Sequence, residues 1–125
     1  MQHLLETSIA HAKKRKQFGQ PIGQFQLVAS KIVDMKLRVD TARYTLYDAA
    51  YKIQQGRTAI VETAMAKLHI SDSWAKCCED AVQIRGAYGY MTRHEVERDL
   101  RDSIASRIYS GTNEIQRNLI AALLI

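Results

Sequence analysis

The stretch FQLVASKIVDMKLRVDTARYTLYDAAYKIQ, residues 25–54, decides the fold of this chain of 125 residues. Its apolar residues recur at alternate steps of four and three: Val28, Ile32, Met35, Val39, Ala42, Leu46, Ala49 and Ile53. This spacing places them on one face of a helix, and no proline interrupts the run. Gly56 suits a left-handed C-terminal cap directly after it. We therefore expect one long helix over residues 25–54.

A second apolar seam follows at once. Its residues repeat the four-and-three spacing: Val61, Ala64, Leu68, Ser71, Ala75, Cys78 and Val82. Thr58 stands where it can cap the start of this helix. The short joint at Gly56 makes the two long helices antiparallel. Each should measure roughly 40 Å at 1.5 Å per residue, and the small side chains of the second seam permit a close approach.

Shorter segments stand on either side of this pair. Residues 4–16 have helical apolar spacing but no N-cap signal, so we expect this helix to begin earlier, in a longer protein. Residues 17–24 contain two glycines and a proline and form a loop that turns sharply. Residues 95–106 form a short charged helix, and Thr112 or Asn113 can cap a last one.

The pattern as a whole predicts an all-α fold. No segment alternates as a strand does, so we expect no sheet and an antiparallel up-and-down bundle of four or five helices. It forms one domain over residues 1–125. No apolar stretch is long enough to span a bilayer, and no leader signals secretion. Cys77 and Cys78 are helix neighbours that point apart, so we expect reduced thiols in a cytoplasmic protein without membrane contact.

The formal charge is +5, from 18 Lys and Arg against 13 Asp and Glu. Nucleic acid is one partner that such a charge allows. Acidic and basic residues alternate, however, and no basic helix face carries interleaved aromatic residues, so we expect no nucleic-acid binding. The dense run at residues 13–16 suits a helix C-terminus or a small phosphate ligand. The four histidines lack metal-ligand spacing, so we expect no metal site.

Two signals point weakly to phosphate chemistry. Arg15 ends a helix directly before the loop that begins at Gln17. Thr112 precedes the last helix, whose N-terminal amides can meet an anion. Ser110 stands between Tyr109 and a glycine, but no strand precedes it, so it does not form the nucleophile elbow of a hydrolase.

Three landmarks in order, over nearly the whole chain, resemble the C-terminal domain of the acyl-CoA dehydrogenases. The first is RKQFGQPIG at residues 15–23, followed by Phe25-Gln26. The second is DAVQIRGAYGY at residues 80–90. The third is Arg101-Asp102 with IYSGTNEIQR at residues 108–117. The resemblance implies a four-helix bundle, with FAD held between it and a middle β-domain that this chain lacks.

The matched cofactor-binding positions form three groups. The first group touches the flavin nucleotide and consists of Arg15, Gln17 and Phe18. The second group reaches the FAD of a neighbouring subunit and consists of Gln83, Ile84 and Gly86. The third group lies near the flavin and its dinucleotide tail and consists of Thr112 and Glu114. Physically, the planar fork of an arginine suits a pyrophosphate. A phenylalanine offers an apolar face, and a glycine lets the backbone come close.

The sequence departs from the family pattern at three places. Ala87 replaces the second glycine of a pair, and Ser103 and Ile104 replace a frequent Ala-Lys. Ser110 occupies the place where many members carry the catalytic glutamate. A serine hydroxyl is too weak a base to remove an acyl α-proton. Either the base lies in an upstream part of the first helix, as in some branches of the family, or this homologue has lost the reaction.

We favour the upstream base, because the FAD-facing positions are intact. The resemblance then implies an FAD-dependent dehydrogenase of acyl thioesters, carried on CoA or a carrier protein, and a homo-oligomer of the tetramer type. The electron acceptor stays open. Two other classes remain: a non-catalytic helical oligomerisation or interaction domain, which would ignore FAD, and a nucleic-acid-binding bundle, which would bind with a steep salt dependence.

Overall fold

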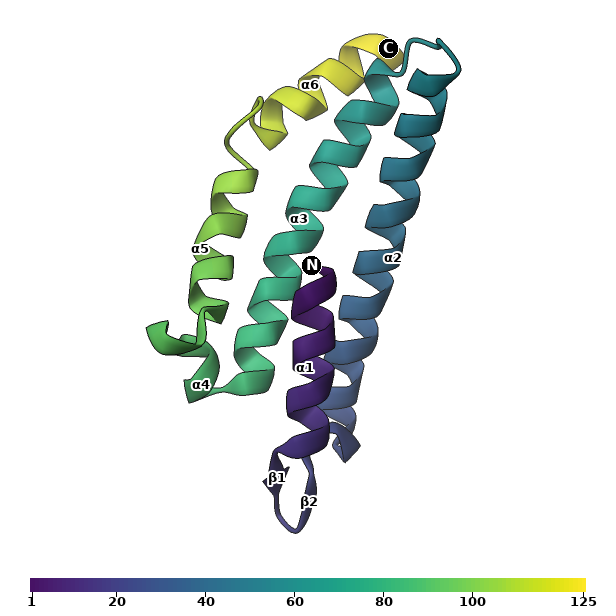
Figure 1. Ribbon diagram of the computed structural model, residues 1–125. Coiled ribbons are helices and arrows are strands. Elements are labelled where there is room, and N and C mark those ends of the chain that lie inside the picture. The colour runs from purple at the N-terminus through teal and green to yellow at the C-terminus, as the bar shows by residue number, and fades with distance from the viewer.

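The computed structural model covers residues 1–125 and consists of helices joined by short connections (Figure 1). In chain order the elements are α1 (Gln2–Lys14), β1 (Lys16–Gln17), β2 (Gln20–Pro21), the 3-10 turn η1 (Ile22–Gln24), α2 (Gln26–Gln54), α3 (Ile60–Arg85), α4 (Ala87–Tyr90), the 3-10 turn η2 (Thr92–His94), α5 (Val96–Ser106) and α6 (Asn113–Leu124). The predicted all-α class is confirmed. None of these helices combines the length and the apolar character that a membrane crossing requires.

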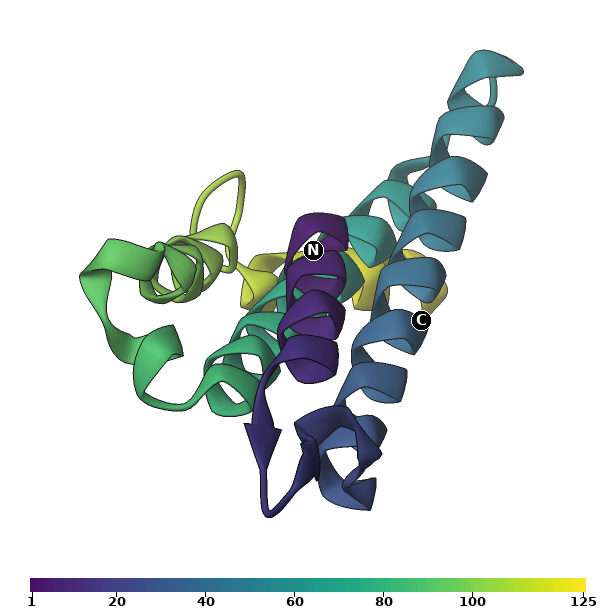
Figure 2. The ribbon, with the colours of Figure 1, turned by 60° about the horizontal axis from the view of Figure 1, so that its bottom comes forward.

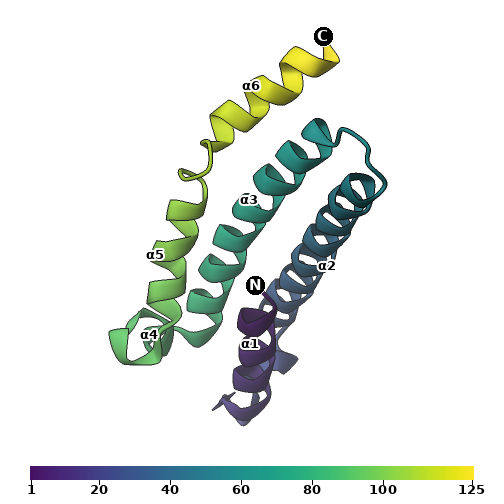
Figure 3. The ribbon, with the colours of Figure 1, turned by 45° about the horizontal axis from the view of Figure 1, so that its top comes forward.

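Helix α3 is the centre of the arrangement. It packs against α1 and α2 on one side and against α5 and α6 on the other. The chain runs down α1, up α2, down α3 and up again through α5 and α6, which follow one another along α3 (Figures 1 and 3). The up-and-down order agrees with the prediction, and the fourth position of the bundle is divided between these last two helices.

The core lies where α1 covers the α2–α3 pair. Its buried residues come from four helices: Leu4, Leu5, Ala12, Met35, Val39, Cys77, Cys78, Ala81, Ile84 and Val96. Both thiols are free and fully buried, and burial raises the pKa of Cys78 to about 12. A thiol with so high a pKa stays protonated and unreactive, which agrees with the place of Cys78 in the second apolar seam.

The two predicted seams are buried only in part. Met35, Val39 and Ala42 are buried, but Leu46 and Ile53 are 49% and 57% exposed. The reason is the length of α1, which has 13 residues against 29 in α2. Helix α1 therefore lies along the first half of α2 only and does not cover the second half, as Figure 1 shows.

The predicted caps were right at two helix ends and wrong at a third. Gly56, with φ 71°, ends α2; its N–H donates to Ile53 O at 2.9 Å, and the next N–H donates to Lys52 O at 3.0 Å. Thr112 caps α6 by accepting from the N–H of Ile115 at 3.3 Å. Thr58 does not cap α3, because the helix begins two residues later and Ala59 holds the N-cap position without a side-chain bond.

The expectation of no sheet was wrong for the segment predicted as a sharply turning loop. Lys16–Gln17 and Gln20–Pro21 pair as a minimal antiparallel hairpin. Phe18 and Gly19 form its two-residue turn with φ of 50° and 82°. Positive φ at both positions is typical of the tight turns that match the twist of two paired strands. Strands this short leave no alternating pattern to detect.

The close approach of α4 to α3 depends on Gly89. A Cβ at this position would lie 2.7 Å from both Cα and O of Val82, which are backbone atoms and cannot move aside. We expect Gly89→Ala to lower the free energy of unfolding by about 1–3 kcal/mol, because the added methyl group overpacks the contact between α4 and α3. Chemical denaturation measures this change, and an unaltered midpoint would contradict the contact.

Candidate functional site

The first two groups of predicted cofactor positions meet at one end of the bundle. The hairpin that follows α1 and the C-terminal end of α3 both lie there (Figures 1 and 2). Arg15 leaves the helical path with φ −71° and ψ 128°, which directs the chain into the hairpin. Its carbonyl accepts from the N–H of Ile22 at 2.8 Å, which closes the hairpin base. Its guanidinium is exposed and makes no hydrogen bond or ion pair within the chain.

Phe18 stands at the tip of the hairpin. Its side chain is 92% exposed, and its ring meets the edge of Phe25 at 6.1 Å and 89°. Gln17 beside it is exposed as well. A large aromatic ring held in water by a tight turn gains nothing for folding. It therefore offers an apolar face to a ligand or a partner.

The α3 end presents its three predicted residues in different ways. Gln83 and Gly86 are exposed, and Gly86 has φ 58° and ψ −132°. The side chain of Ile84, by contrast, is 6% exposed and belongs to the core. Its side chain therefore cannot reach a ligand, and only its backbone could take part in binding.

Between the hairpin and the α3 end lies a basic cavity of about 640 Å³. Its lining contains cations, histidines and one tyrosine, and no carboxylate: His11, Lys14, Arg15, Lys16, Arg85, Tyr88 and His94. The Nε of Arg85 is buried without a hydrogen-bond partner. Since a buried N–H donor without an acceptor is costly, this cavity is suited to an anion with several acceptor oxygens, such as a phosphate or diphosphate.

Two histidines of this cavity were considered in the sequence only as metal ligands and were not predicted as site residues. His11 and His94 both approach the ring of Tyr88, at centroid distances of 6.4 Å and 5.2 Å. Burial lowers the pKa of His11, and the positive charges of Arg85 and Arg15 lower it further. The spacing of His11 and Arg15, four residues apart at the C-terminal end of α1, was the available signal. Arg85 lies within the second landmark, between Ile84 and Gly86, but the sequence did not single it out as a binding residue.

The third group lies apart from this end. Ser110 and Thr112 belong to the joint between α5 and α6, which lies midway along α3 (Figure 3), and Glu114 follows in α6. Glu114 is exposed in the first turn of α6, and the backbone hydrogen bond there holds its pKa below the usual value, with help from Thr112. Ser110 is exposed with φ 56°. The structure thus gathers six of the eight positions at one end and leaves the other two on the side of α3.

Comparison with known proteins gives one consistent result. The family model described as acyl-CoA dehydrogenase, C-terminal domain, matches residues 1–125. A probable acyl-CoA dehydrogenase of Bacillus subtilis, YngJ, is 44% identical over 124 residues, which cover 99% of this chain and 33% of that protein. An L-prolyl-[peptidyl-carrier protein] dehydrogenase of Serratia sp. is 46% identical over 121 residues, 97% of this chain and 31% of that protein.

Solved structures agree. The prolyl acyl carrier protein oxidase AnaB matches with a TM-score of 0.96 and 53% identity, over 98% of this chain and 32% of that one. The FAD complex of PigA matches with a TM-score of 0.96 and 45% identity, over the same shares. The chain thus spans about a third of the length of the relatives that it matches.

Proposed function

The chain belongs to the acyl-CoA dehydrogenase family, whose C-terminal domain it matches over its full length, and we propose that it serves as this domain of an FAD-dependent acyl-thioester dehydrogenase. The observation that carries the proposal is the basic cavity at the end of the bundle where the hairpin exposes the ring of Phe18. A dinucleotide cofactor combines a diphosphate with flat apolar rings, and this end of the bundle offers a partner for each.

The residues present fit FAD on physical grounds. Arg15 has no partner within the chain, and Arg85 has a buried Nε without one. A diphosphate would supply the missing acceptors through charge-assisted hydrogen bonds. When bound, FAD supplies the redox chemistry of the family, accepting a hydride from the β-carbon of the thioester as a base removes the α-proton. The residues of this chain hold and orient the cofactor.

The separation of the site groups supports an oligomer. The hairpin and the α3 end share one cavity, whereas Thr112 and Glu114 lie on another side of α3. We propose that the two regions contact FAD molecules of different subunits in a homotetramer. Exposed apolar side chains along the uncovered half of α2 and on α6 suit subunit contacts: Leu46, Tyr47, Tyr51, Ile53, Leu119, Leu123 and Leu124.

The general base is proposed to lie outside residues 1–125. Ser110 replaces the glutamate of many family members, and its hydroxyl cannot act as the base. The thioester substrate is carried on CoA or on a carrier protein. The similarity to AnaB and to the Serratia enzyme, both named for prolyl groups on carrier proteins, makes a prolyl carrier-protein thioester the first substrate to test.

The test uses the full-length protein. We expect it to purify with bound FAD and to lose flavin absorbance under anaerobic conditions when a prolyl carrier-protein thioester or an acyl-CoA is added. Comparing the two thioesters identifies the carrier. A well-folded oligomer that neither retains nor binds FAD would contradict the proposal and favour the alternative, a non-catalytic helical oligomerisation domain.

A further inference from the structure

The joint between α5 and α6 is a turn closed by its own hydrogen bonds. The N–H of Asn113 donates to Arg107 O at 3.0 Å, which brings the two ends of the turn together. The side-chain amide of Gln116 donates to Ser110 O at 3.2 Å and to Gly111 O at 3.3 Å. Ser110 has a positive φ, which is unfavourable for a serine. This conformation therefore needs support from its surroundings.

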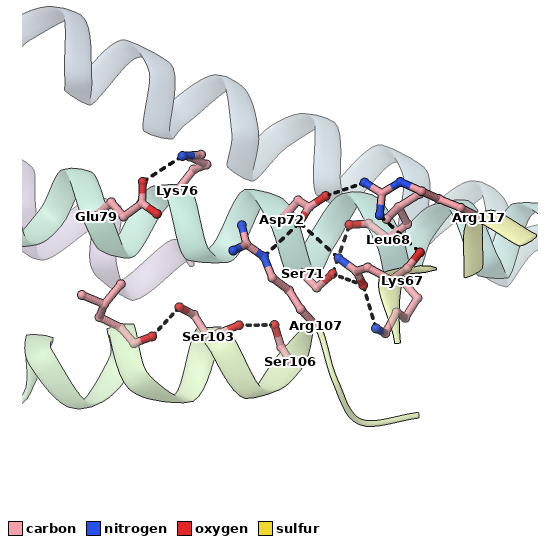
Figure 4. A network of polar contacts seen from close by, with 12 residues as sticks. Lys67, Leu68, Ser71, Asp72, Lys76, Glu79, Ser103, Ser106, Arg107 and Arg117 are labelled. Carbon is pink, nitrogen blue, oxygen red and sulfur yellow. Dashed lines mark hydrogen bonds and ion pairs between the residues drawn. The ribbon is translucent and has the colours of Figure 1, made fainter. Parts of the chain in front are cut away.

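That support comes from α3, whose Lys67, Ser71 and Asp72 lie along one stretch of the helix (Figure 4). All three form hydrogen bonds with the side chain of Asn113. This side chain is 3% exposed and makes three hydrogen bonds to one face of α3. Its Oδ1 accepts from Lys67 Nζ at 2.8 Å and from Ser71 Oγ at 3.0 Å, and its Nδ2 donates to Asp72 Oδ1 at 3.1 Å. With three bonds and almost no exposure, the side chain has one available orientation.

Asp72 connects this anchor to both sides of the turn. Its Oδ1 lies 2.9 Å from Arg107 Nε, at the start of the turn, and its Oδ2 lies 3.4 Å from an Nη of Arg117, in α6. The Nε of Arg107 is buried and has no hydrogen-bond partner of good geometry. The Asp72 carboxylate is therefore the charge that compensates it. One carboxylate on α3 holds the residues before, within and after the turn.

We propose that Asp72 is a positioning residue for the cofactor: acting through Asn113 and Arg107, it holds the turn so that Thr112 and Glu114 present their FAD contacts. The inference rests on the proposed function for the identity of the cofactor. No sequence landmark contains Asp72, and no direct contact with FAD is assigned to it. Its effect is on the shape and rigidity of the turn.

The test compares Asp72→Asn with Asp80→Asn in the full-length protein. Asp80 is a matched control on the same helix, since it pairs with Lys31 at 3.1 Å and Arg38 at 2.7 Å but holds α2 and not the turn. We expect Asp72→Asn to weaken FAD binding to the apoprotein about tenfold, as the loss of one charged anchor does. Asp80→Asn should change it less than twofold. Equal weakening by both variants would overturn the proposal.

A double variant separates positioning from stability. In Asp72→Asn alone, Arg107 loses its counter-charge, so the protein is destabilised as well. Asp72→Asn/Arg107→Gln removes both charges and should recover most of the thermal midpoint. The weaker FAD binding should persist, because the carboxylate that anchors the turn to α3 is still missing. Recovery of both properties together would reduce Asp72 to a purely structural role. This variant also replaces the single one if that fails to fold.

Hydrogen exchange provides a readout that does not depend on FAD. Asp72→Asn should speed amide exchange at Asn113, whose N–H closes the turn, and Asp80→Asn should not. Unchanged exchange in Asp72→Asn would overturn the positioning role. If the parent protein binds no FAD at all, the proposed function fails, and with it the cofactor part of this inference. Exchange at Asn113 still decides whether Asp72 holds the turn.

Discussion

Residues 1–125 alone, mixed with FAD and an acyl thioester without oxygen, are expected to leave the flavin fully oxidised. Two independent reasons lead to this result. The basic cavity and the hairpin lie at one open end of the bundle, and this chain has no strands beyond the minimal hairpin with which to cover a bound flavin. The chemistry also needs a carboxylate near the α-carbon, and Ser110 occupies its usual place.

A variant of the same chain sharpens this experiment. Ser110→Glu restores a carboxylate at the usual position but not the cover for the flavin, so it should remain inactive in residues 1–125. A helical circular dichroism spectrum confirms that each sample is folded. Loss of flavin absorbance with the parent chain would overturn both reasons. Loss with Ser110→Glu alone would overturn the need for a cover and would leave the need for a carboxylate in force.

Replacing Arg15 by alanine in the full-length protein is expected to weaken FAD binding roughly 10- to 100-fold, as the loss of one charge-assisted contact does. Arg15 lines the basic cavity beside Arg85. Its side chain makes no contact that supports the fold, because it is exposed and has no ion pair. The free energy of unfolding of the apoprotein should therefore change by less than about 0.5 kcal/mol. FAD titration and thermal denaturation of the apoprotein measure the two effects.

Arg57→Ala is the matched control for this change. Arg57 is also exposed and has the same charge, but it follows α2 at the opposite end of the bundle. It should leave FAD binding unchanged. If Arg15→Ala binds FAD as tightly as the parent, Arg15 does not belong to the site. If the two variants lose FAD equally, the effect is one of net charge alone.

Local patterns in the sequence were sufficient for much of the fold. The period of the two seams predicted α2 and α3 and their antiparallel pairing across Gly56, and the landmarks indicated the family. Helical spacing depends on residues three and four positions apart, so it can be seen without tertiary structure. The hairpin was missed, because paired strands of two residues each leave no such pattern.

Burial along the seams was not determined by their period. Val39 and Leu46 are seven residues apart and occupy the same position of the repeat, yet the first is 5% exposed and the second is 49% exposed. The difference depends on how far α1 reaches along α2, which is a property of packing.

The sequence by itself determined helices α1, α2, α3, α5 and α6 and their order, but not the short α4. It also determined the residues around Arg15, Gly86 and Thr112 that mark the family. The tertiary structure decided which of these residues meet. It joined His11, Arg85 and His94 to Arg15 in one cavity and left Thr112 and Glu114 elsewhere. It also tied Asn113 to residues of α3 that lie 41 to 46 positions away in the chain. Such contacts depend on how whole helices pack against one another, and no short-range periodicity contains that information.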